Sequence, residues 1–415
     1  MSKYIIKGGK KLQGSVKISG SKNAALPIIA GTILNKGIST LYNVPDISDT
    51  QMMYEILKQI GAKIVKFKNK VIIDTREISI YEIPHELMRK MRSSVIIAGA
   101  LIGKYKKCKF SYPGGCDIGA RPIDLHLKAF SKLGINVDKN YGNIECECKE
   151  IIGDKIDLEF PSVGATENII LSSVLGKGVT TITNAAREPE IIDLQKFLNK
   201  MGANIEGAGT DIIKIVGVHK LKNVSYNIMP DRIEAATFLC IAAATSSQLT
   251  IEQIEPSHLT PIIHKLEEMG CELEIEKRLI KIKGPKKLKA VDIKTMPYPG
   301  FPTDMQSILA ATLTIAKGTS IVIENIFENR FRYTQELVTM GAKISIQGKS
   351  AVIKGVRRLY GAKVVATDLR GGAALVIAGL VAKTETVIDN NRYILRGYDK
   401  IDKKLQAIGA NIREE

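Results

Sequence analysis

One short segment holds the residue types that could do the most chemistry. Residues 113–122 place Cys116 on a glycine-rich, proline-bounded loop, and Arg121 follows five residues later. Glycines reach backbone angles closed to other residues, so this loop can bend and move. A neighbouring guanidinium lowers a thiol's pKa and can also hold an anionic substrate. The pattern indicates a reactive thiol beside an anion site, against the alternative of a surface turn with an incidental cysteine.

Charged residues also recur at the starts of segments rich in small residues. These are Lys22, Arg92, Arg232, Asp304 and Arg370, with Thr166 as the uncharged exception. A second set follows short apolar strands and consists of Arg121, Arg187, Glu188, Arg330 and Arg396. Singly, each would be a solvated surface charge or a cap. Together on one rim with helix N-termini, they favour a site for a small phosphorylated anion and a second phosphate-bearing substrate.

The elements that must position these residues come from an internal repeat. A helix that ends in glycine before a short apolar strand occurs six times, at Gly61, Gly134, Gly202, Gly270, Gly341 and Gly409. Successive glycines lie 73, 68, 68, 71 and 68 residues apart. Each is predicted to be a C′ cap, where only glycine takes the left-handed conformation without strain. The fixed period predicts six copies of one unit.

A second helix begins each unit. The six are predicted at 23–34, 92–103, 165–175, 232–244, 304–316 and 370–382. Small residues on most of their faces predict burial on several sides. A strand such as 180–184 joins the two helices, and a hairpin such as 343–353 follows the glycine. Each unit of about 70 residues is too small to bury its own faces well.

The units divide three and three into domains. We predict one domain of residues 1–21 plus 230–415 and another of residues 22–229, with the active site in the cleft between them. The sixth unit stops without its second hairpin strand, whereas residues 4–20 read as strand–turn–strand with no unit before them. We therefore expect the N-terminal strands to complete the last unit.

Composition bounds the class of protein. The chain has 415 residues, of which 45% are hydrophobic and 25% charged, as in soluble globular proteins. It has no run of about 18 apolar residues, and its first residues do not resemble a signal peptide, so we expect a cytoplasmic protein without membrane insertion. Its six cysteines are then expected to be reduced, and Cys146 and Cys148 have no second pair nearby. We predict no metal and no cofactor.

The net charge of +17 would suit either nucleic acid or a phosphorylated small substrate. The lysines are scattered, aromatic residues make up 5% of the chain and tryptophan is absent. This composition disfavours a surface on which bases stack, so we expect no nucleic-acid partner.

Five segments together resemble one enzyme family. They are SGSKNAALP (19–27), PGGCDIGARPIDLH (113–126), NAAREPE (184–190), PTDMQ (302–306) and ENRF (328–331). They are similar to segments of the UDP-N-acetylglucosamine 1-carboxyvinyltransferases, which are enolpyruvyl transferases of the EPSP synthase superfamily, and the resemblance extends over essentially the whole chain. It implies an α/β fold of two inside-out α/β barrel domains, each with three pseudo-symmetric repeats.

The resemblance also implies a reaction. Enolpyruvyl moves from phosphoenolpyruvate to the 3-hydroxyl of UDP-N-acetylglucosamine and phosphate leaves, by addition and then elimination, in the step that opens peptidoglycan synthesis and so bears on cell shape and division. This chemistry needs a proton donor near the methylene, a base near the hydroxyl, and cations around the phosphate and carboxylate. By resemblance Cys116 is the donor, forms a covalent phosphoenolpyruvate adduct and is the fosfomycin target, and Asp304 receives the hydroxyl proton.

Other site residues follow from the same resemblance. Lys22 is expected to be catalytic with Cys116 and Asp304. Phosphoenolpyruvate contacts are expected from Lys22, Asn23, Arg92, Cys116, Arg121, Arg370 and Arg396. Contacts with UDP-N-acetylglucosamine are expected from Asn23, Arg92, Arg121, Pro122, Ile123, Asp124, Leu125, Ser162, Val163, Gly164, Asp304 and Ile326.

The chain departs from the family pattern at two places. Ser48 stands where some members carry a lysine, so one anion contact is not carried over. Gly371 and Gly372 follow Arg370 and are expected to loosen the start of that helix.

Two alternative functions remain. A 3-phosphoshikimate 1-carboxyvinyltransferase shares the fold and phosphoenolpyruvate, but the Cys116 loop and the uridine-site match disfavour it. A silent or regulatory paralogue would bind the uridine sugar without turnover, and the presence of Cys116, Asp304 and Lys22 disfavours that reading.

Overall fold

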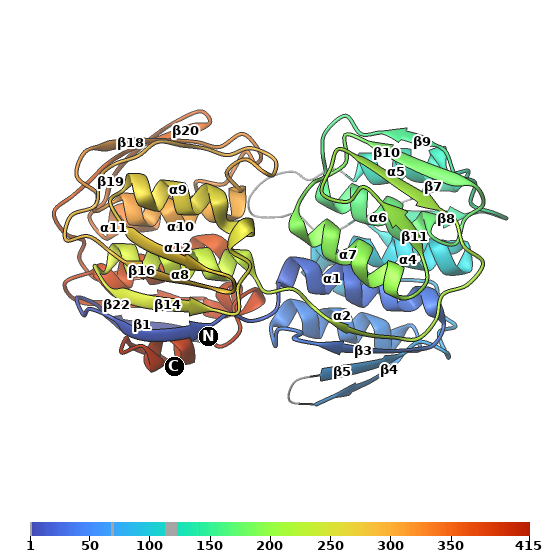
Figure 1. Ribbon diagram of the computed structural model, residues 1–415, viewed down its shortest axis with the longest axis horizontal. Helices are drawn as coiled ribbons and strands as arrows, with labels where there is room; N and C mark the ends of the chain where they lie inside the picture. Colours follow the sequence, from blue (N-terminus) through green and yellow to red (C-terminus); the bar gives the residue numbers. More distant parts are fainter. Residues whose placement is uncertain (1, 68–69, 113–122, 141) are drawn as a thin grey trace. The chain divides into compact units, whose positions relative to one another are not determined.

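The computed structural model describes residues 2–67, 70–112, 123–140 and 142–415. Contacts divide the chain into two compact units. We call residues 2–19 with 230–415 the terminal unit, because it holds both chain ends, and residues 20–229 the internal unit (Figure 1). Residues 20 and 21 pack with the internal unit, whereas the predicted boundary lies after residue 21.

Each unit has three small-residue helices at its centre. In the internal unit these are α1 (Lys22–Gly31), α4 (Ile96–Tyr105) and α6 (Val163–Ser173), and in the terminal unit α8 (Arg232–Ala244), α10 (Thr303–Leu313) and α12 (Leu369–Val381). All 13 residues of α8 are buried. Figure 1 shows the sheets lying outside these helices in both units. The predicted six buried helices and the inside-out α/β fold class are confirmed.

Small residues at the centre let helix backbones touch. A Cβ added at Gly99 of α4 would lie 2.8 Å from the carbonyl oxygen of Asn168 in α6. One added at Gly103 would lie 2.4 Å from the carbonyl oxygen of Leu171. Real Cβ atoms do not approach so closely, so only glycine permits this helix–helix distance.

The glycine-capped helices form the second set. They are α2 (Ser48–Gln59), α5 (Asp124–Lys132), α7 (Pro189–Lys200), α9 (Thr260–Glu268), α11 (Thr334–Thr339) and α13 (Ile401–Ala407). Each ends before its predicted glycine, and all six of these glycines have φ between 78° and 111°. The predicted C′ caps are therefore confirmed. Shorter helical segments are η1 (Thr32–Asn35), α3 (His85–Lys90), η2 (Arg92–Val95), η3 (Pro256–Leu259) and η4 (Asn391–Arg396).

The strands of the described residues form six sheets built on one pattern. A strand that joins the two helices of a repeat pairs antiparallel with the second strand of a hairpin. The joining strands are β3 (Ile38–Tyr42), β6 (Lys107–Ser111), β10 (Val179–Thr183), β14 (Gln248–Glu252), β18 (Thr319–Ile323) and β22 (Glu385–Asp389). The hairpins are β4 (Lys63–Lys66) with β5 (Lys70–Asp74), β7 (Asn136–Asn140) with β8 (Asn143–Glu147), β11 (Asn204–Glu206) with β12 (Ile212–Val216), β15 (Glu272–Glu276) with β16 (Leu279–Lys283), and β19 (Lys343–Gln347) with β20 (Ser350–Lys354).

A further strand lies parallel to the joining strand in five of the six sheets. These strands are β2 (Gln13–Lys17), β9 (Lys155–Asp157), β13 (Val224–Asn227), β17 (Ile293–Lys294) and β21 (Lys363–Val365). Strand β13, from the end of the internal unit, pairs with β3 at its beginning. The last strand of that unit therefore closes it onto the first repeat.

The terminal unit is closed by the N-terminal strands. Strand β1 (Lys3–Lys7) pairs antiparallel with both β22 and β23 (Asn411–Glu414), so it occupies the place of the second hairpin strand that the sixth repeat lacks. Strand β2 adds to β14 in parallel. The expectation that the N-terminus supplies the missing strand of the last repeat is confirmed for β1, whereas β2 joins the sheet of the fourth repeat.

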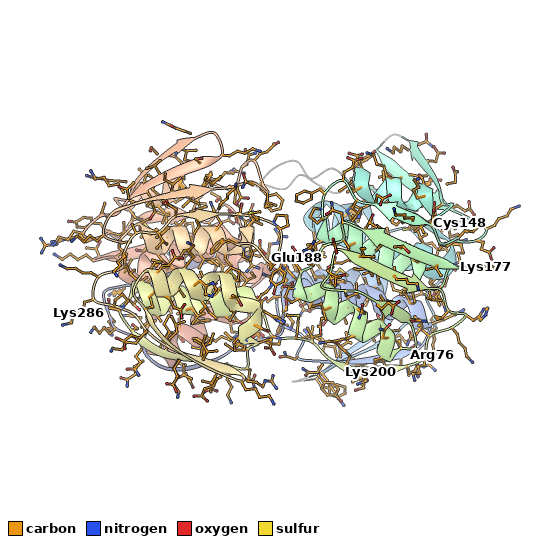
Figure 2. The ribbon with its side chains drawn as sticks, turned by 45° about the horizontal axis from the view of Figure 1, so that its top comes forward. Arg76, Cys148, Lys177, Glu188, Lys200 and Lys286 are labelled. Atoms are coloured by element: carbon orange, nitrogen blue, oxygen red, sulfur yellow. The ribbon has the colours of Figure 1, made fainter. Side chains whose placement is uncertain are left out.

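Much of the positive charge lies on the outer faces of the units. Arg76, Lys177, Lys200 and Lys286 are exposed and point outward in Figure 2. Arg76 pairs with Asp74 at 2.7 Å and Lys177 with Glu150 at 2.6 Å, contacts that contribute little when exposed. Over the described ranges, no helix is long and apolar enough to cross a membrane.

Candidate active site

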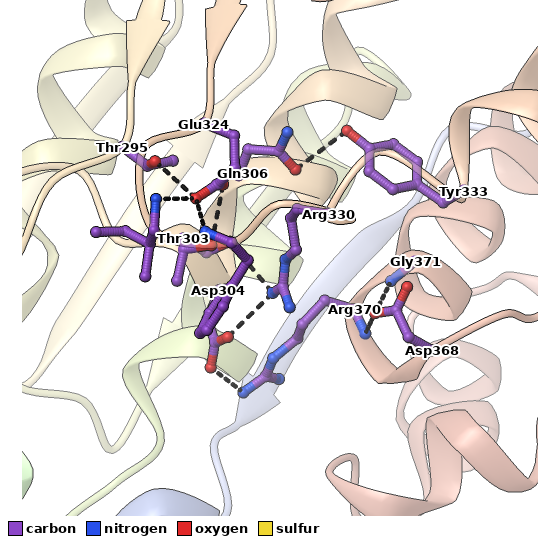
Figure 3. Close-up of polar contacts among 12 residues, drawn as sticks. Thr295, Thr303, Asp304, Gln306, Glu324, Arg330, Tyr333, Asp368, Arg370 and Gly371 are labelled. Carbon is purple, nitrogen blue, oxygen red and sulfur yellow. Dashed lines mark hydrogen bonds and ion pairs between the residues drawn. The ribbon is translucent and has the colours of Figure 1, made fainter. Parts of the chain in front are cut away.

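Several predicted site residues gather around the start of α10 in the terminal unit. Asp304 is the second residue of that helix, where the helix dipole favours a negative charge. Its Oδ1 accepts a hydrogen bond from Nη2 of Arg330 at 3.0 Å, and its Oδ2 accepts one from Nη2 of Arg370 at 3.1 Å (Figure 3). The Asp304 side chain is 28% exposed and both arginine side chains are 3% exposed. A reachable carboxylate thus lies between two buried cations.

Arg370 is supported by its own helix start. Asp368 caps α12, accepting hydrogen bonds from the backbone N–H of Arg370 and of Gly371, both at 3.0 Å. A Cβ added at Gly371 would lie 2.9 Å from Cβ of Tyr333, and one at Gly372 would lie 2.6 Å from Ile394. The expectation that these glycines loosen the helix start is wrong, since both are buried in a capped helix and permit close packing.

The guanidinium of Arg370 remains charged, and two of its nitrogen atoms are available as hydrogen-bond donors. Burial lowers its pKa, but the negative charge of Asp304, followed by Tyr398 and Asp231, outweighs that effect and raises the pKa overall. Nε and Nη1 of Arg370 and Nε of Arg330 are buried and make no hydrogen bond to the part of the chain that the structure describes. Buried donors without acceptors are unfavourable, so this cluster is suited to receive an anion.

Lys22 begins α1 in the internal unit, behind the N-cap Ser21. Its Nζ lies 2.7 Å from Oδ2 of Asp49, and the two side chains are 10% and 4% exposed. Asp49 lies in the first turn of α2, next to the exposed Ser48. Asn23 follows Lys22 and is partly exposed. The pairing of Lys22 with Asp49 was not predicted from the sequence, which placed Lys22 at a helix start but did not single out Asp49.

The structure brings together two segments predicted to hold the uridine sugar. Ile123 precedes α5, which begins at Asp124 and includes Leu125. Ser162 caps α6, whose first residues are Val163 and Gly164. His126, the third residue of α5, lies 3.2 Å from the position that a Cβ on Gly164 would take, and its Nδ1 lies 2.7 Å from Nδ2 of Asn168. The two helix starts are therefore neighbours.

For the other predicted site residues, the structure gives at most their place in the fold and their exposure. Cys116, Arg121 and Pro122 lie outside the described residues. Arg92 opens η2, which leads into α4. Arg396 ends η4 and is partly exposed. Ile326 lies in the turn after β18 and is also partly exposed.

Three comparisons with known proteins agree with this architecture. A family model described as EPSP synthase (3-phosphoshikimate 1-carboxyvinyltransferase) matches residues 6–405. The chain belongs to the EPSP synthase family. It is 53% identical to UDP-N-acetylglucosamine 1-carboxyvinyltransferase 2 of Caldanaerobacter subterraneus subsp. tengcongensis, over 99% of each chain. It is 46% identical to the UDP-N-acetylglucosamine 1-carboxyvinyltransferase of Geobacter metallireducens, over 100% of this chain and 99% of that one. Within the EPSP synthase family, the chain therefore groups with the UDP-N-acetylglucosamine 1-carboxyvinyltransferases.

Solved structures of the EPSP synthase family share this fold. The enolpyruvyl transferase NikO from Streptomyces tendae superimposes with a TM-score of 0.90 at 24% identity, over 100% of this chain and 98% of that one. An EPSP synthase from Acinetobacter baumannii superimposes with a TM-score of 0.76 at 18% identity, over 100% of both chains.

Two residues of the set in phase with the repeat make contacts of other kinds. Arg187 is exposed and lies 3.4 Å from Asp211 in a surface ion pair. The buried guanidinium of Arg232 lies 5.5 Å from the centre of the Tyr298 ring. Periodicity therefore identified where charged residues recur in the repeats of this chain, but not which of these charges lie close together.

A buried carboxylate near Glu188 was also missed. Glu167 of α6 is 6% exposed, and burial raises the pKa of its carboxyl well above its usual value, with smaller contributions from Glu190 and Glu188. The signal in the sequence was the pair Glu188 and Glu190 after a strand, but nothing indicated that a third carboxyl approaches them.

Burial disfavours the ionisation of several described thiols. It raises the pKa of Cys146 and of Cys271 to about 12, and it also raises the pKa of the partly exposed Cys148. A thiol must ionise to act as a nucleophile. These three cysteines are therefore poor candidates for a reactive thiol, which is the role predicted for Cys116.

Proposed function

We propose that this protein transfers the enolpyruvyl group of phosphoenolpyruvate to the 3-hydroxyl of UDP-N-acetylglucosamine, releasing phosphate. The observation that carries the proposal is the Arg330–Asp304–Arg370 cluster, in a chain similar along its whole length to proteins named for this activity. A carboxylate held in place by two buried guanidiniums joins a proton acceptor to cations, which this reaction needs together.

In the proposed addition step, the thiol of Cys116 gives its proton to the methylene carbon of phosphoenolpyruvate. The sugar 3-hydroxyl oxygen forms a bond to C2, and Asp304 takes the hydroxyl proton. In the elimination step, the C2–O bond to phosphate breaks and phosphate leaves, while the new methyl group returns a proton to the Cys116 thiolate and the double bond is restored. Asp304 passes the former 3-hydroxyl proton to the departing phosphate, so both side chains regain their starting protonation states.

Positively charged side chains are assigned to the phosphate and carboxylate groups of phosphoenolpyruvate. Arg370 offers its remaining buried donors to phosphate or carboxylate, and Lys22 brings an ammonium already oriented by Asp49. We assign Asn23, Arg92, Arg121 and Arg396 to the same substrate. We further assign Pro122–Leu125, Ser162–Gly164, Asp304 and Ile326, with Asn23, Arg92 and Arg121, to the uridine sugar. Residues of both units would thus act on one pair of substrates.

The cellular role follows from the same proposal. The product would enter peptidoglycan synthesis in the cytoplasm, so loss of the enzyme would affect cell shape and division. Cys116 would carry the covalent phosphoenolpyruvate adduct and would be the target of fosfomycin.

A direct assay tests the proposal. Phosphate release is measured from phosphoenolpyruvate with UDP-N-acetylglucosamine and, in parallel, with shikimate 3-phosphate. We expect release only with the uridine sugar. Release only with shikimate 3-phosphate would overturn the substrate assignment, and no release with either acceptor would favour a silent paralogue.

A further inference from the structure

Glu324 is a buried carboxylate beside the Arg330–Asp304–Arg370 cluster, but among the described residues it forms no ion pair with Arg330 or Arg370. It follows β18 directly and is 1% exposed. Its Oε1 accepts hydrogen bonds from Thr295 Oγ1 at 2.9 Å, Ile326 N at 2.8 Å and Phe327 N at 3.1 Å. Its Oε2 accepts one from Thr303 Oγ1 at 3.0 Å (Figure 3). Four donors therefore converge on one carboxylate, which offsets the unfavourable burial of its charge.

The donors come from three separate segments. Thr295 follows β17, Thr303 is the first residue of α10, and Ile326 and Phe327 form the turn after β18. Thr295 Oγ1 also accepts a hydrogen bond from Asn325 N at 2.9 Å, so the turn is held twice. One carboxylate thus joins the start of α10 to the turn that contains Ile326.

Thr303 is held from two sides. Glu324 accepts a hydrogen bond from its hydroxyl, and Nη2 of Arg330 donates to its carbonyl oxygen at 3.2 Å while also donating to Asp304. Because Thr303 and Asp304 are adjacent, fixing the first fixes the backbone of the second. The turn on the other side of Glu324 leaves Ile326 partly exposed and able to contact a ligand.

We propose that Glu324 is a positioning residue that sets the location of the proton acceptor Asp304 and of the uridine-sugar turn Asn325–Phe327 together. The inference rests on the proposed function, because it assumes that Asp304 and Ile326 serve the same substrate. Its consequence is that affinity for the uridine sugar and the rate of the chemical step depend on one buried carboxylate that touches neither substrate.

The test uses steady-state kinetics of Glu324→Ala and Glu324→Gln in the full chain. For Glu324→Ala we expect KM for UDP-N-acetylglucosamine to rise by about tenfold or more and kcat to fall by at least about tenfold, while KM for phosphoenolpyruvate stays within about threefold. Glutamine can retain all four hydrogen bonds if the Thr303 hydroxyl turns to accept one. We therefore expect Glu324→Gln to recover most of both losses.

A control separates positioning from general stability. Leu309 lies in α10 and is fully buried, so Leu309→Ala should lower the unfolding midpoint without changing KM for the uridine sugar. The inference is overturned if Glu324→Ala keeps KM for the uridine sugar within about threefold of wild type, or if Leu309→Ala raises it equally. A wild-type protein inactive with UDP-N-acetylglucosamine would instead refute the proposed function.

Two smaller changes test the inference should Glu324→Ala fail to fold. Thr303→Val removes the link to α10 and should lower kcat, with little effect on binding of UDP-N-acetylglucosamine measured by calorimetry. Thr295→Val removes the link to the turn and should weaken that binding, with a smaller effect on kcat. Equal effects of both variants on both quantities, or no effect of either, would contradict the inference.

Discussion

Replacing Asp304 with asparagine removes one negative charge from between two buried positive charges. Asparagine has nearly the same shape, so packing changes little, but Nη2 of Arg330 and Nη2 of Arg370 can no longer both donate to an anion. One of the two would face an amide nitrogen, which is itself a donor. We expect Asp304→Asn to lose both stability and activity, for different physical reasons.

The loss of stability can be sized from the geometry. The two hydrogen bonds, at 3.0 and 3.1 Å, are charge-assisted, and such bonds contribute about 1.5–3 kcal/mol each. Leaving a buried charge without its partner typically destabilises by about 3–5 kcal/mol. Because the Asp304 side chain is 28% exposed and water screens it, we expect a smaller loss, about 2–4 kcal/mol.

The loss of activity should be larger. A missing general base reduces the rate by about 10² or more, whereas binding of the uridine sugar should stay within about tenfold of wild type. If binding vanishes as well, Asp304 is mainly a ligand for the sugar.

The assay that isolates the charge argument is urea unfolding with and without inorganic phosphate, at constant ionic strength set by chloride. Without Asp304, the arginine pair should bind phosphate more tightly than in the wild type. An anion at ten times its Kd stabilises the folded state by about 1.4 kcal/mol. Phosphate should therefore restore part of the variant's lost stability and should stabilise the wild type less.

The control is Glu77→Gln, which breaks the exposed pair with Lys63 at 2.8 Å. Its unfolding midpoint should stay nearly the same, because water screens exposed pairs. Equal stability of Asp304→Asn and wild type, together with an equal response to phosphate, would refute the assignment of Asp304 as the counterion of the two arginines.

Three further predictions concern other parts of the chain. Cys116→Ser should abolish labelling by fosfomycin, measured by intact mass, and retained labelling would mean that another thiol reacts. Gly99→Ala should destabilise the internal unit by about 1–3 kcal/mol, measured by urea unfolding, because the new Cβ would lie 2.8 Å from the Asn168 carbonyl oxygen. An unchanged unfolding midpoint would contradict backbone contact between α4 and α6. Burial raises the pKa of Asp193 from 3.8 to about 6, although the hydrogen bonds that its carboxylate accepts from Tyr226 and from Met229 N lower that pKa. The folded state therefore holds a proton that the unfolded chain releases first, so stability falls by about 2 kcal/mol as pH rises from 4 to 7. Asp193→Asn should lack this fall, and parallel pH profiles of variant and wild type would argue against it.

Local features of the fold could be predicted because their cause is local. A helix C′ position with positive φ strongly prefers glycine, so the six glycines at near-constant spacing revealed the repeat and its caps. Helices made of small residues must pack closely, and their burial followed from composition alone. The missing strand of the sixth repeat could be assigned to the N-terminus because unpaired sheet edges are unfavourable.

The pairing of charges could not be predicted in this way. Asp304 is 26 residues from Arg330 and 66 from Arg370, and several other charges in phase with the repeat would have fitted the same pattern. Arg187 is one of them, but it lies in a surface ion pair with Asp211. Which charges meet depends on side-chain directions and on distances of a few ångströms, which a repeat period does not specify.

By itself, the sequence determined the six-fold repeat, the glycine caps, the α/β class and, through its motifs, the enzyme family. Each of these depends on residue type and spacing within a single repeat. Only the tertiary structure decided that Asp304 lies between two buried arginines, that Asp49 orients Lys22, and that Glu324 joins α10 to the turn of Ile326. The physical reason is that electrostatic and hydrogen-bond energies depend steeply on distance and burial, and both are set by how distant segments pack.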